Sequence, residues 1–460
     1  MASEDPAGTM RARPTIAELI GVFSSEMASH VTAYRNVNRF LRFAHTGAAR
    51  EFNKVLQEHG VAVDGDDAGR YSVTGVFENL QLRRAQRRIA DIETAQAITP
   101  VSIFLGLYSR YEALANAVVS HCVRLAPERF VNTGSTYCYE RVVAAGSLDG
   151  FRESVVAELT DDLNRRSPYD LMKYFRGSHK LDIDLNSVWP RFIEVSERRN
   201  CLAHNGGRVS SQYITNTQAV GYKHAENPGV GDELPLGDEY FTMATRVLLE
   251  VGVVQAFALA RHFEGDHVAQ ALSDAVTDAA IDLMRIGLHD AALAILRSAM
   301  VQIGDGLDAA THMVYQINIA QAEKWAGRHG ACRATLDKID WSGAADRFQF
   351  AVRVLKDDLG GAESMMIRAC GEGEGLIAEG ALLDWPLFRE FRKTEHFRRG
   401  YECVFGRMPH PNVMQLTDGS GTREALPGEG EEDGEPDVHT VLDDVRASEV
   451  GPDDQSPAHG

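Results

Sequence analysis

One segment of the sequence carries the residue types that phosphodiester cleavage requires. Residues 197–207 read ERRNCLAHNGG, so that Arg199 is followed five positions later by His204. A guanidinium binds phosphate and stabilises charge on its oxygens. An imidazole, with a pKa of about 6.5, transfers protons at neutral pH. The spacing alone is weak evidence, because about one such Arg/His pair is expected by chance in a chain of this composition.

The position of these residues on a helix strengthens the interpretation. We predict a helix over 188–204, capped by Asn186 or Ser187 and ended by Asn205-Gly206-Gly207, since Asn and Gly accept the left-handed conformation that closes a helix. One face of this helix carries a single stripe, made of Val188, Phe192, Val195, Arg199 and Leu202. An unpaired guanidinium buried there costs several kcal/mol, so Arg199 needs a carboxylate, a partner subunit or a phosphate.

Arg199 and His204 each have a structural explanation as well, because a basic side chain near a helix C-terminus complements its dipole. Their joint occurrence before Asn-Gly-Gly favours the functional reading. Asn200 lies four residues before His204 on the same face, where it can orient the imidazole or share a ligand with it.

The segment also resembles a known protein family. Arg199-Asn200-x-x-x-His204 is similar to the R-polar-x-x-x-H signature of HEPN domains, which are all-helical modules. The resemblance covers about residues 100–263, including Glu112 on the first apolar helix. The fuller string, with Tyr213 after it, resembles the RiboL-PSP-like bacterial HEPN branch.

The resemblance implies a homodimer in which two Arg/His pairs face each other in one cleft. It implies a metal-independent RNA endonuclease without cofactor, in which the 2′-OH attacks and leaves 2′,3′-cyclic phosphate and 5′-OH ends. His204 would transfer protons, Arg199 would hold the scissile phosphate, and Asn200 would position the phosphate or the imidazole. Two neighbouring arginines, Arg198 and Arg208, are candidate RNA-backbone contacts, with a solvated surface role as the alternative.

Glu112 is a candidate supporting residue. It could pair with Arg199 in the resting state, or it could have a plain intrahelical or surface role.

The rest of the body reads as all-α. Residues 1–99 form an N-terminal helical region of unknown role, with helices over 27–60 and 77–98 and a Gly/Asp-rich turn region between them. The cluster Arg83, Arg84, Arg87 and Arg88 favours a solvated helix face over a phosphate-binding stripe. Within the HEPN-like region, 100–263, we expect helices over 101–125, 148–164, 169–175, 188–204 and 239–263, with a long polar loop before the last one.

Residues 268–407 predict tetratricopeptide-like helical repeats. Three short turns begin at Gly287, Gly327 and Asp358, each between two apolar-periodic helices. The aligned alanines at 291, 331 and 362 lie 40 and 31 residues apart, on either side of the tetratricopeptide period of about 34. Residues 384–397 could form a helix that caps the last open apolar face.

Composition excludes several classes of protein. At 460 residues, 25% charged and 44% hydrophobic, the chain is globular, with no basic-then-apolar leader and no apolar run of about 18 residues. Six scattered cysteines argue against a disulfide scaffold, a zinc site or an iron–sulfur cluster and favour the cytoplasm. The motifs of P-loop NTPases, Rossmann enzymes and α/β-hydrolases are missing.

The net charge of −19 is concentrated at the C-terminus. Residues 411–460 hold 13 acidic residues and two arginines and few large apolar ones, which predicts a disordered acidic tail. The remaining charge of −8 neither implies nor excludes an RNA-binding cleft.

Three functions follow from these features. The first is a cytoplasmic HEPN ribonuclease of a bacterial defence or toxin system, with RNA as substrate, no membrane partner, and a possible protein partner on its repeats. The second is a non-catalytic adaptor of HEPN and helical-repeat type that binds RNA or a protein. The third is a toxin paired with a nucleotidyltransferase antitoxin.

Overall fold

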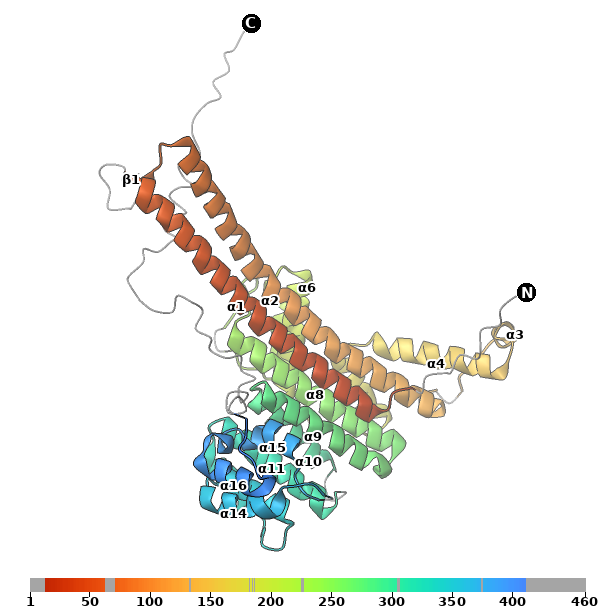
Figure 1. Ribbon diagram of the computed structural model, residues 1–460. Helices are drawn as coiled ribbons and strands as arrows, with labels where there is room; N and C mark the ends of the chain where they lie inside the picture. The colour runs from red at the N-terminus through yellow and green to blue at the C-terminus, as the bar shows by residue number, and fades with distance from the viewer. Residues whose placement is uncertain are drawn as a thin grey trace, which may run out of the picture. The chain divides into compact units, whose positions relative to one another are not determined.

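The computed structural model describes residues 13–62, 71–131, 134–181, 183, 185, 187–224, 227–303, 307–373 and 375–410 (Figure 1). These described residues are all-α apart from one antiparallel pair of two-residue strands, β1 (Val61–Ala62) and β2 (Tyr71–Ser72). The predicted acidic tail, 411–460, and the predicted cap Asn186 lie outside the described residues.

Two long helices contribute to two compact units. Within α1 (Ile16–His59) the division falls after Val31, and within α2 (Val76–Leu125) it falls before Phe104. The smaller unit contains residues 32–103, and the larger contains the start of α1, the end of α2 and the described chain beyond them. The region predicted as helical repeats and the region predicted as HEPN-like, from Phe104 onward, therefore share one compact unit.

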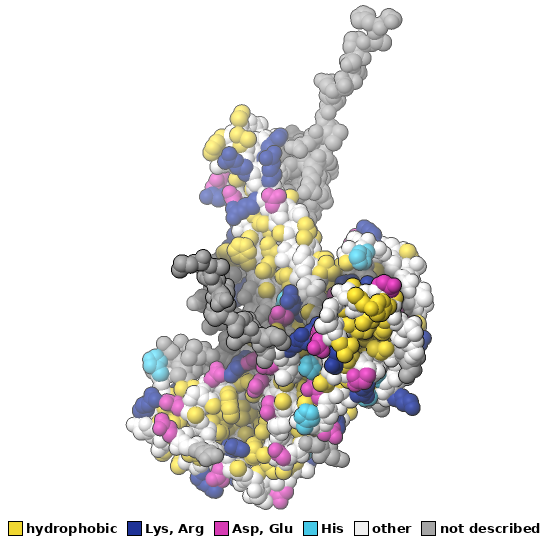
Figure 2. All heavy atoms as spheres, turned by 90° about the vertical axis from the view of Figure 1, so that its right-hand side faces the viewer, with side chains coloured by type: hydrophobic (Ala, Val, Ile, Leu, Met, Phe, Trp, Pro, Cys, Tyr) yellow, Lys and Arg dark blue, Asp and Glu magenta, His cyan; other side chains and the backbone are white. Residues whose placement is uncertain are grey.

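The smaller unit is a helical hairpin closed by β1 and β2. Its core is a cluster of apolar residues spaced at helical intervals on both arms, namely Ala48, Phe52, Val55, Leu56, Val73, Leu82, Ala85 and Ile89. The arginines at 83, 84, 87 and 88 are all exposed, and Arg88 pairs across the hairpin with Glu51 at 3.2 Å. Figure 2 shows hydrophobic side chains at the end of the hairpin, with Lys and Arg side chains close by.

The expected break between helices over 77–98 and 101–125 is wrong, because α2 is continuous and contains Pro100. A proline inside a helix removes one hydrogen bond and costs about 3 kcal/mol. Fully buried residues on both sides of it, Ile89 and Phe104, anchor the two halves of the helix and offset that cost.

The core of the larger unit is built around α8 (Asp238–Glu264), where nearly every residue from Phe241 to Ala260 is buried. Among the described residues, α8 alone is long and apolar enough to span a membrane, but 83% of that window is buried inside the protein, as in the core helix of a bundle. Gly252 allows close packing, since a Cβ there would lie 3.0 Å from Phe23 of α1 and 3.1 Å from Leu114 of α2.

Shorter helices surround α8. After a 3-10 turn at Pro127–Arg129 come α3 (Tyr139–Ala144), α4 (Leu148–Asn164), α5 (Pro168–Ser178), α6 (Trp189–His204) and α7 (Ser211–Ala219). The predicted helices over 148–164, 169–175, 188–204 and 239–263 are confirmed, whereas α3 was not predicted.

Two local expectations near α6 need correction. Val188 is the N-cap of α6 and contributes no side-chain hydrogen bond, so Ser187 does not cap the helix. The predicted polar loop contains α7, which begins where the Ser210 hydroxyl accepts from Tyr213 N and which buries Tyr213 and Thr217. Two buried residues, one of them polar, are too few to give a visible helical period.

Three helical hairpins follow α8, as the turns in the sequence predict. They are formed by α9 (Ala269–Arg285) with α10 (His289–Ile303), α11 (Ala309–Trp325) with α12 (His329–Leu336), and α13 (Asp346–Leu355) with α14 (Leu359–Ala369). Left-handed residues mark the turns at Gly287, Gly327 and Asp357. The third turn therefore aligns at Asp357, one residue earlier than the alanine alignment implies.

The predicted capping helix over 384–397 is not formed as one helix. After α15 (Glu379–Asp384), two 3-10 turns at Pro386–Phe388 and Phe391–Lys393 lead into α16 (Glu395–Phe405). The phenylalanines at 388, 391 and 397 are nevertheless buried in the apolar cluster of the last hairpin, so this segment covers that face.

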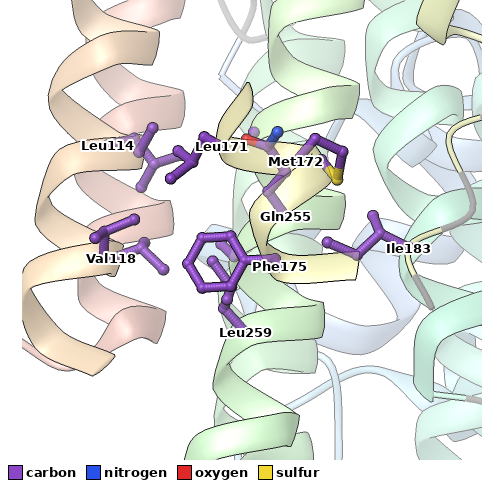
Figure 3. Close-up of a pocket in the computed structure, with 12 residues that line it drawn as sticks. Leu114, Val118, Leu171, Met172, Phe175, Ile183, Gln255 and Leu259 are labelled. Carbon is purple, nitrogen blue, oxygen red and sulfur yellow. The ribbon is translucent and has the colours of Figure 1, made fainter. Parts of the chain in front are cut away.

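A small void remains between α2, α5 and α8. It measures about 20 Å³ and is lined by apolar side chains such as Leu114, Val118, Phe175 and Leu259, with Gln255 beside them (Figure 3). A cavity of this size has room for about one water molecule. It is a packing defect of the core and does not serve as a ligand site.

Candidate functional site

A polar pocket opens beside α6. It has a volume of about 770 Å³, and the side chains that line it come from α2, α4, α5, α6 and α7 and from the segment that joins α4 to α5. We call it the α6 pocket. Its polar lining residues include Tyr108, Glu112, Arg165, Arg166, Tyr169, Asp170, Glu197, Arg199, Asn200, Gln212 and Asn216.

Arg199 lies in this pocket, paired with a carboxylate. Its Nη2 atom is 3.1 Å from each carboxylate oxygen of Glu112, which lies 87 residues earlier on α2. The guanidinium carbon also lies 5.2 Å from the ring centroid of Tyr108. Glu112 therefore supplies the partner that the apolar stripe on α6 requires, while 27% of the Arg199 side chain stays exposed.

Asn200 lines the same pocket and accepts a hydrogen bond from Nη1 of Arg199 at 3.2 Å. His204 is exposed at the last residue of α6 and is not among the residues that line the pocket. Five residues along a helix correspond to a rotation of about 140° beyond a full turn. Within one chain, the fold therefore brings Arg199 and Asn200 together and leaves His204 outside the pocket.

The two neighbouring arginines are engaged elsewhere. Arg198 is only 12% exposed, and its guanidinium bonds Glu194 at 2.8 Å and the Pro235 carbonyl at 2.6 Å. Arg198 is therefore held by groups of the protein itself and is not among the residues that line the α6 pocket, and its contact with an RNA backbone stays a prediction. Arg208 pairs with Glu233 at 2.8 Å, and its side chain is 58% exposed. It lies outside the lining of the α6 pocket.

A buried polar network behind α6 fixes the orientation of the helix. Glu194 has no solvent exposure and accepts hydrogen bonds from Arg198, from the Tyr213 hydroxyl of α7 and from the Tyr240 hydroxyl of α8, each at 2.8 Å. Burial, and next the Glu194 charge, raise the pKa of both tyrosines. These hydroxyls therefore remain hydrogen-bond donors.

On the front of the helix, Tyr108 donates a hydrogen bond to Ser196 at 2.9 Å. Burial raises the pKa of Tyr108 to about 12. Its hydroxyl therefore stays protonated at neutral pH. The Ser196 hydroxyl in turn donates a hydrogen bond to the Phe192 carbonyl at 2.9 Å. These two hydrogen bonds join α2 to α6 at the tyrosine over whose ring Arg199 lies.

The rim of the pocket carries residues that the sequence did not single out. Arg165 and Arg166 follow the end of α4 and are exposed, and Tyr169 in the first turn of α5 is 52% exposed. Arginine binds phosphate and tyrosine stacks on bases. The adjacent arginines at the end of a predicted helix were the only visible signal, because nothing in the sequence places them opposite α6.

Within the ranges that the structure describes, no three His, Cys, Asp or Glu side chains gather in a way that could hold a metal ion. The polar groups of the α6 pocket are guanidinium, amide, hydroxyl and carboxylate groups, and the Glu112 carboxylate is paired with Arg199. The guanidinium groups are suited to an anion, and the amide and carboxylate groups are suited to the polar edge of a base.

No family model, curated protein or solved structure matches this chain.

Proposed function

We propose that this chain is a metal-independent RNA endonuclease of the HEPN type. It acts in the cytoplasm as an effector of a bacterial defence or toxin system. The observation that carries the proposal is the composition of the α6 pocket. Arg199 and Asn200 line it, and so do three exposed residues, Arg165, Arg166 and Tyr169. This combination of phosphate-binding and base-stacking groups is suited to single-stranded RNA.

The reaction uses the nucleophile that RNA itself carries. The 2′-oxygen attacks the adjacent phosphorus, its proton passes to a base, and the bond from phosphorus to the 5′-oxygen breaks as that oxygen takes up a proton. The products end in 2′,3′-cyclic phosphate and 5′-OH. Arg199 exchanges Glu112 for the phosphate and stabilises the charge on its oxygens, and His204 transfers the protons.

The position of His204 supports an active site that is shared between two copies of the chain. The imidazole is exposed at the end of α6 and lies outside its own pocket. A homodimer that brings two α6 helices together supplies His204 of one copy to the Arg199 and Asn200 of the other. The three helical hairpins α9 to α14, which we regard as tetratricopeptide-like, would then receive the protein partner that controls this assembly.

The test is incubation of the full chain with end-labelled single-stranded RNA in EDTA, followed by analysis of the product ends. Cleavage with cyclic-phosphate ends is expected, and Arg199→Ala and His204→Ala should each abolish it. Two exposed residues of the same types, Arg152 and His267, provide matched control variants to alanine. Cleavage by Arg199→Ala and His204→Ala at the wild-type rate would refute the site.

The second candidate is a non-catalytic adaptor. It is favoured by the pairing of Arg199 with Glu112 and by the exclusion of His204 from the pocket lining. It predicts stable RNA binding without scission, in which Arg199→Ala weakens the affinity and His204→Ala leaves it unchanged. The same variants therefore separate the two functions.

A further inference from the structure

Three polar side chains on one wall of the α6 pocket form a hydrogen-bonded relay. The Asn216 amide nitrogen donates to Glu197 Oε1 at 2.8 Å, and the Gln212 amide nitrogen donates to Asn216 Oδ1, also at 2.8 Å. All three residues line the pocket, Glu197 from α6 and the two amides from α7.

The chemistry of the carboxylate fixes the direction of this relay. An ionised carboxylate only accepts hydrogen bonds, so Asn216 must present its amide nitrogen to Glu197. Its oxygen then faces Gln212, which must donate in turn. The groups left for a ligand include two acceptors, the second carboxylate oxygen of Glu197 and the amide oxygen of Gln212.

We propose that the α6 pocket binds a guanine base of single-stranded RNA through these acceptors. Among the four RNA bases, guanine alone presents two adjacent donors, its N1–H and its exocyclic amino group, on the edge that faces a partner. Adenine and cytosine present one amino group there, and uracil presents one N–H. The two oxygens of the Glu197 carboxylate are adjacent acceptors, and a carboxylate oxygen can accept more than one hydrogen bond. Guanine therefore matches Glu197 best, with the Gln212 oxygen as a further acceptor in the same wall.

The remaining lining of the pocket supports a nucleotide. The ring of Tyr169 is half exposed and is held by Trp189, with ring centroids 6.2 Å apart, so that it provides a platform for stacking. Arg165 also lines the pocket and is exposed, so that it can bind a backbone phosphate. The volume of about 770 Å³ falls within the range of about 300–1,000 Å³ that is usual for ligand pockets.

The inference rests on the proposed function only in naming RNA as the source of the base, so it is tested by binding without cleavage. The full chain is titrated into fluorescent 2′-O-methyl oligouridines that carry one central guanine, adenine or uracil. The methyl group blocks attack by the 2′-oxygen. We expect the guanine oligonucleotide to bind about tenfold more tightly than the other two.

Three variants separate the specific recognition of guanine from the overall affinity for RNA. Glu197→Gln, which replaces an acceptor oxygen by a donor, should reduce the guanine preference to less than about twofold. Tyr169→Ala should lower the affinity for all three oligonucleotides about tenfold and leave the preference for guanine unchanged. Glu153→Gln, at an exposed glutamate of α4 outside the pocket, is the matched control and should bind as the wild type does.

Equal affinity for the three oligonucleotides, or a preference that survives in a folded Glu197→Gln protein, would overturn the inference. Guanosine monophosphate is added as a competitor. If it binds while the oligonucleotides show no preference, the source of the base is a free nucleotide and RNA is refuted. Guanine preference without scission in EDTA would refute the endonuclease alone, and scission without any preference would refute the guanine pocket alone.

Discussion

Removal of the Glu194 carboxylate should destabilise the larger unit strongly. This side chain is fully buried and accepts three hydrogen bonds, all at 2.8 Å, from Arg198, Tyr213 and Tyr240. Glu194→Ala leaves a guanidinium that is only 12% exposed without its carboxylate, and two tyrosine hydroxyls lose their acceptor. Loss of one partner of a buried ion pair costs about 3–5 kcal/mol, and we expect a loss of free energy of unfolding in that range.

Two further variants distinguish this explanation from a simple loss of packing. Glu194→Gln keeps one acceptor oxygen and nearly the same volume, so it should cost about 2 kcal/mol. Glu194→Ala combined with Arg198→Met removes the stranded charge and should be more stable than Glu194→Ala alone.

The free energies of unfolding are measured by urea denaturation followed by circular dichroism. Glu153→Gln, at an exposed site on α4, serves as the control and should change stability little. A loss below about 1 kcal/mol for Glu194→Ala, or a double variant that is less stable than Glu194→Ala, would refute the reasoning.

Two other outcomes follow from the structure. Glu112→Gln should increase the affinity for RNA about fivefold, because a phosphate then no longer competes with a carboxylate for Arg199, and this partly exposed ion pair is worth about 1 kcal/mol. The affinity is measured by fluorescence anisotropy titration. A decrease in affinity would show that Glu112 instead positions Arg199. Burial lowers the pKa of His179 and of His262, so below pH of about 6.5 the unfolded chain binds more protons than the folded one and stability falls as the pH decreases. Melting temperatures between about pH 8 and 5 should therefore fall less steeply in the His179→Phe/His262→Phe double variant, and an unchanged slope would contradict this assignment.

Much of the helical framework can be predicted from the sequence because its determinants are local. The helices over 148–164, 188–204 and 239–263 follow from apolar residues that recur every three or four positions, and Asn and Gly residues mark the end of α6. The turns between the helical hairpins follow in the same way, since Gly287 and Gly327 adopt the left-handed conformation. The prediction from the local sequence was wrong at Pro100, which does not end a helix. The burial of apolar residues on both sides of the proline outweighs its tendency to break a helix.

By itself, the sequence established that Arg199 interrupts an apolar face and therefore needs a carboxylate, a partner subunit or a phosphate. Only the tertiary structure decided that this partner is Glu112, 87 residues away, and that Arg198 is bound to Glu194 instead of facing the pocket. It also decided that Arg165, Tyr169 and the relay through Asn216 lie around one pocket with Arg199. Helical periodicity states which side of a helix a residue occupies, but the elements opposite that side depend on long-range packing, which no local spacing encodes.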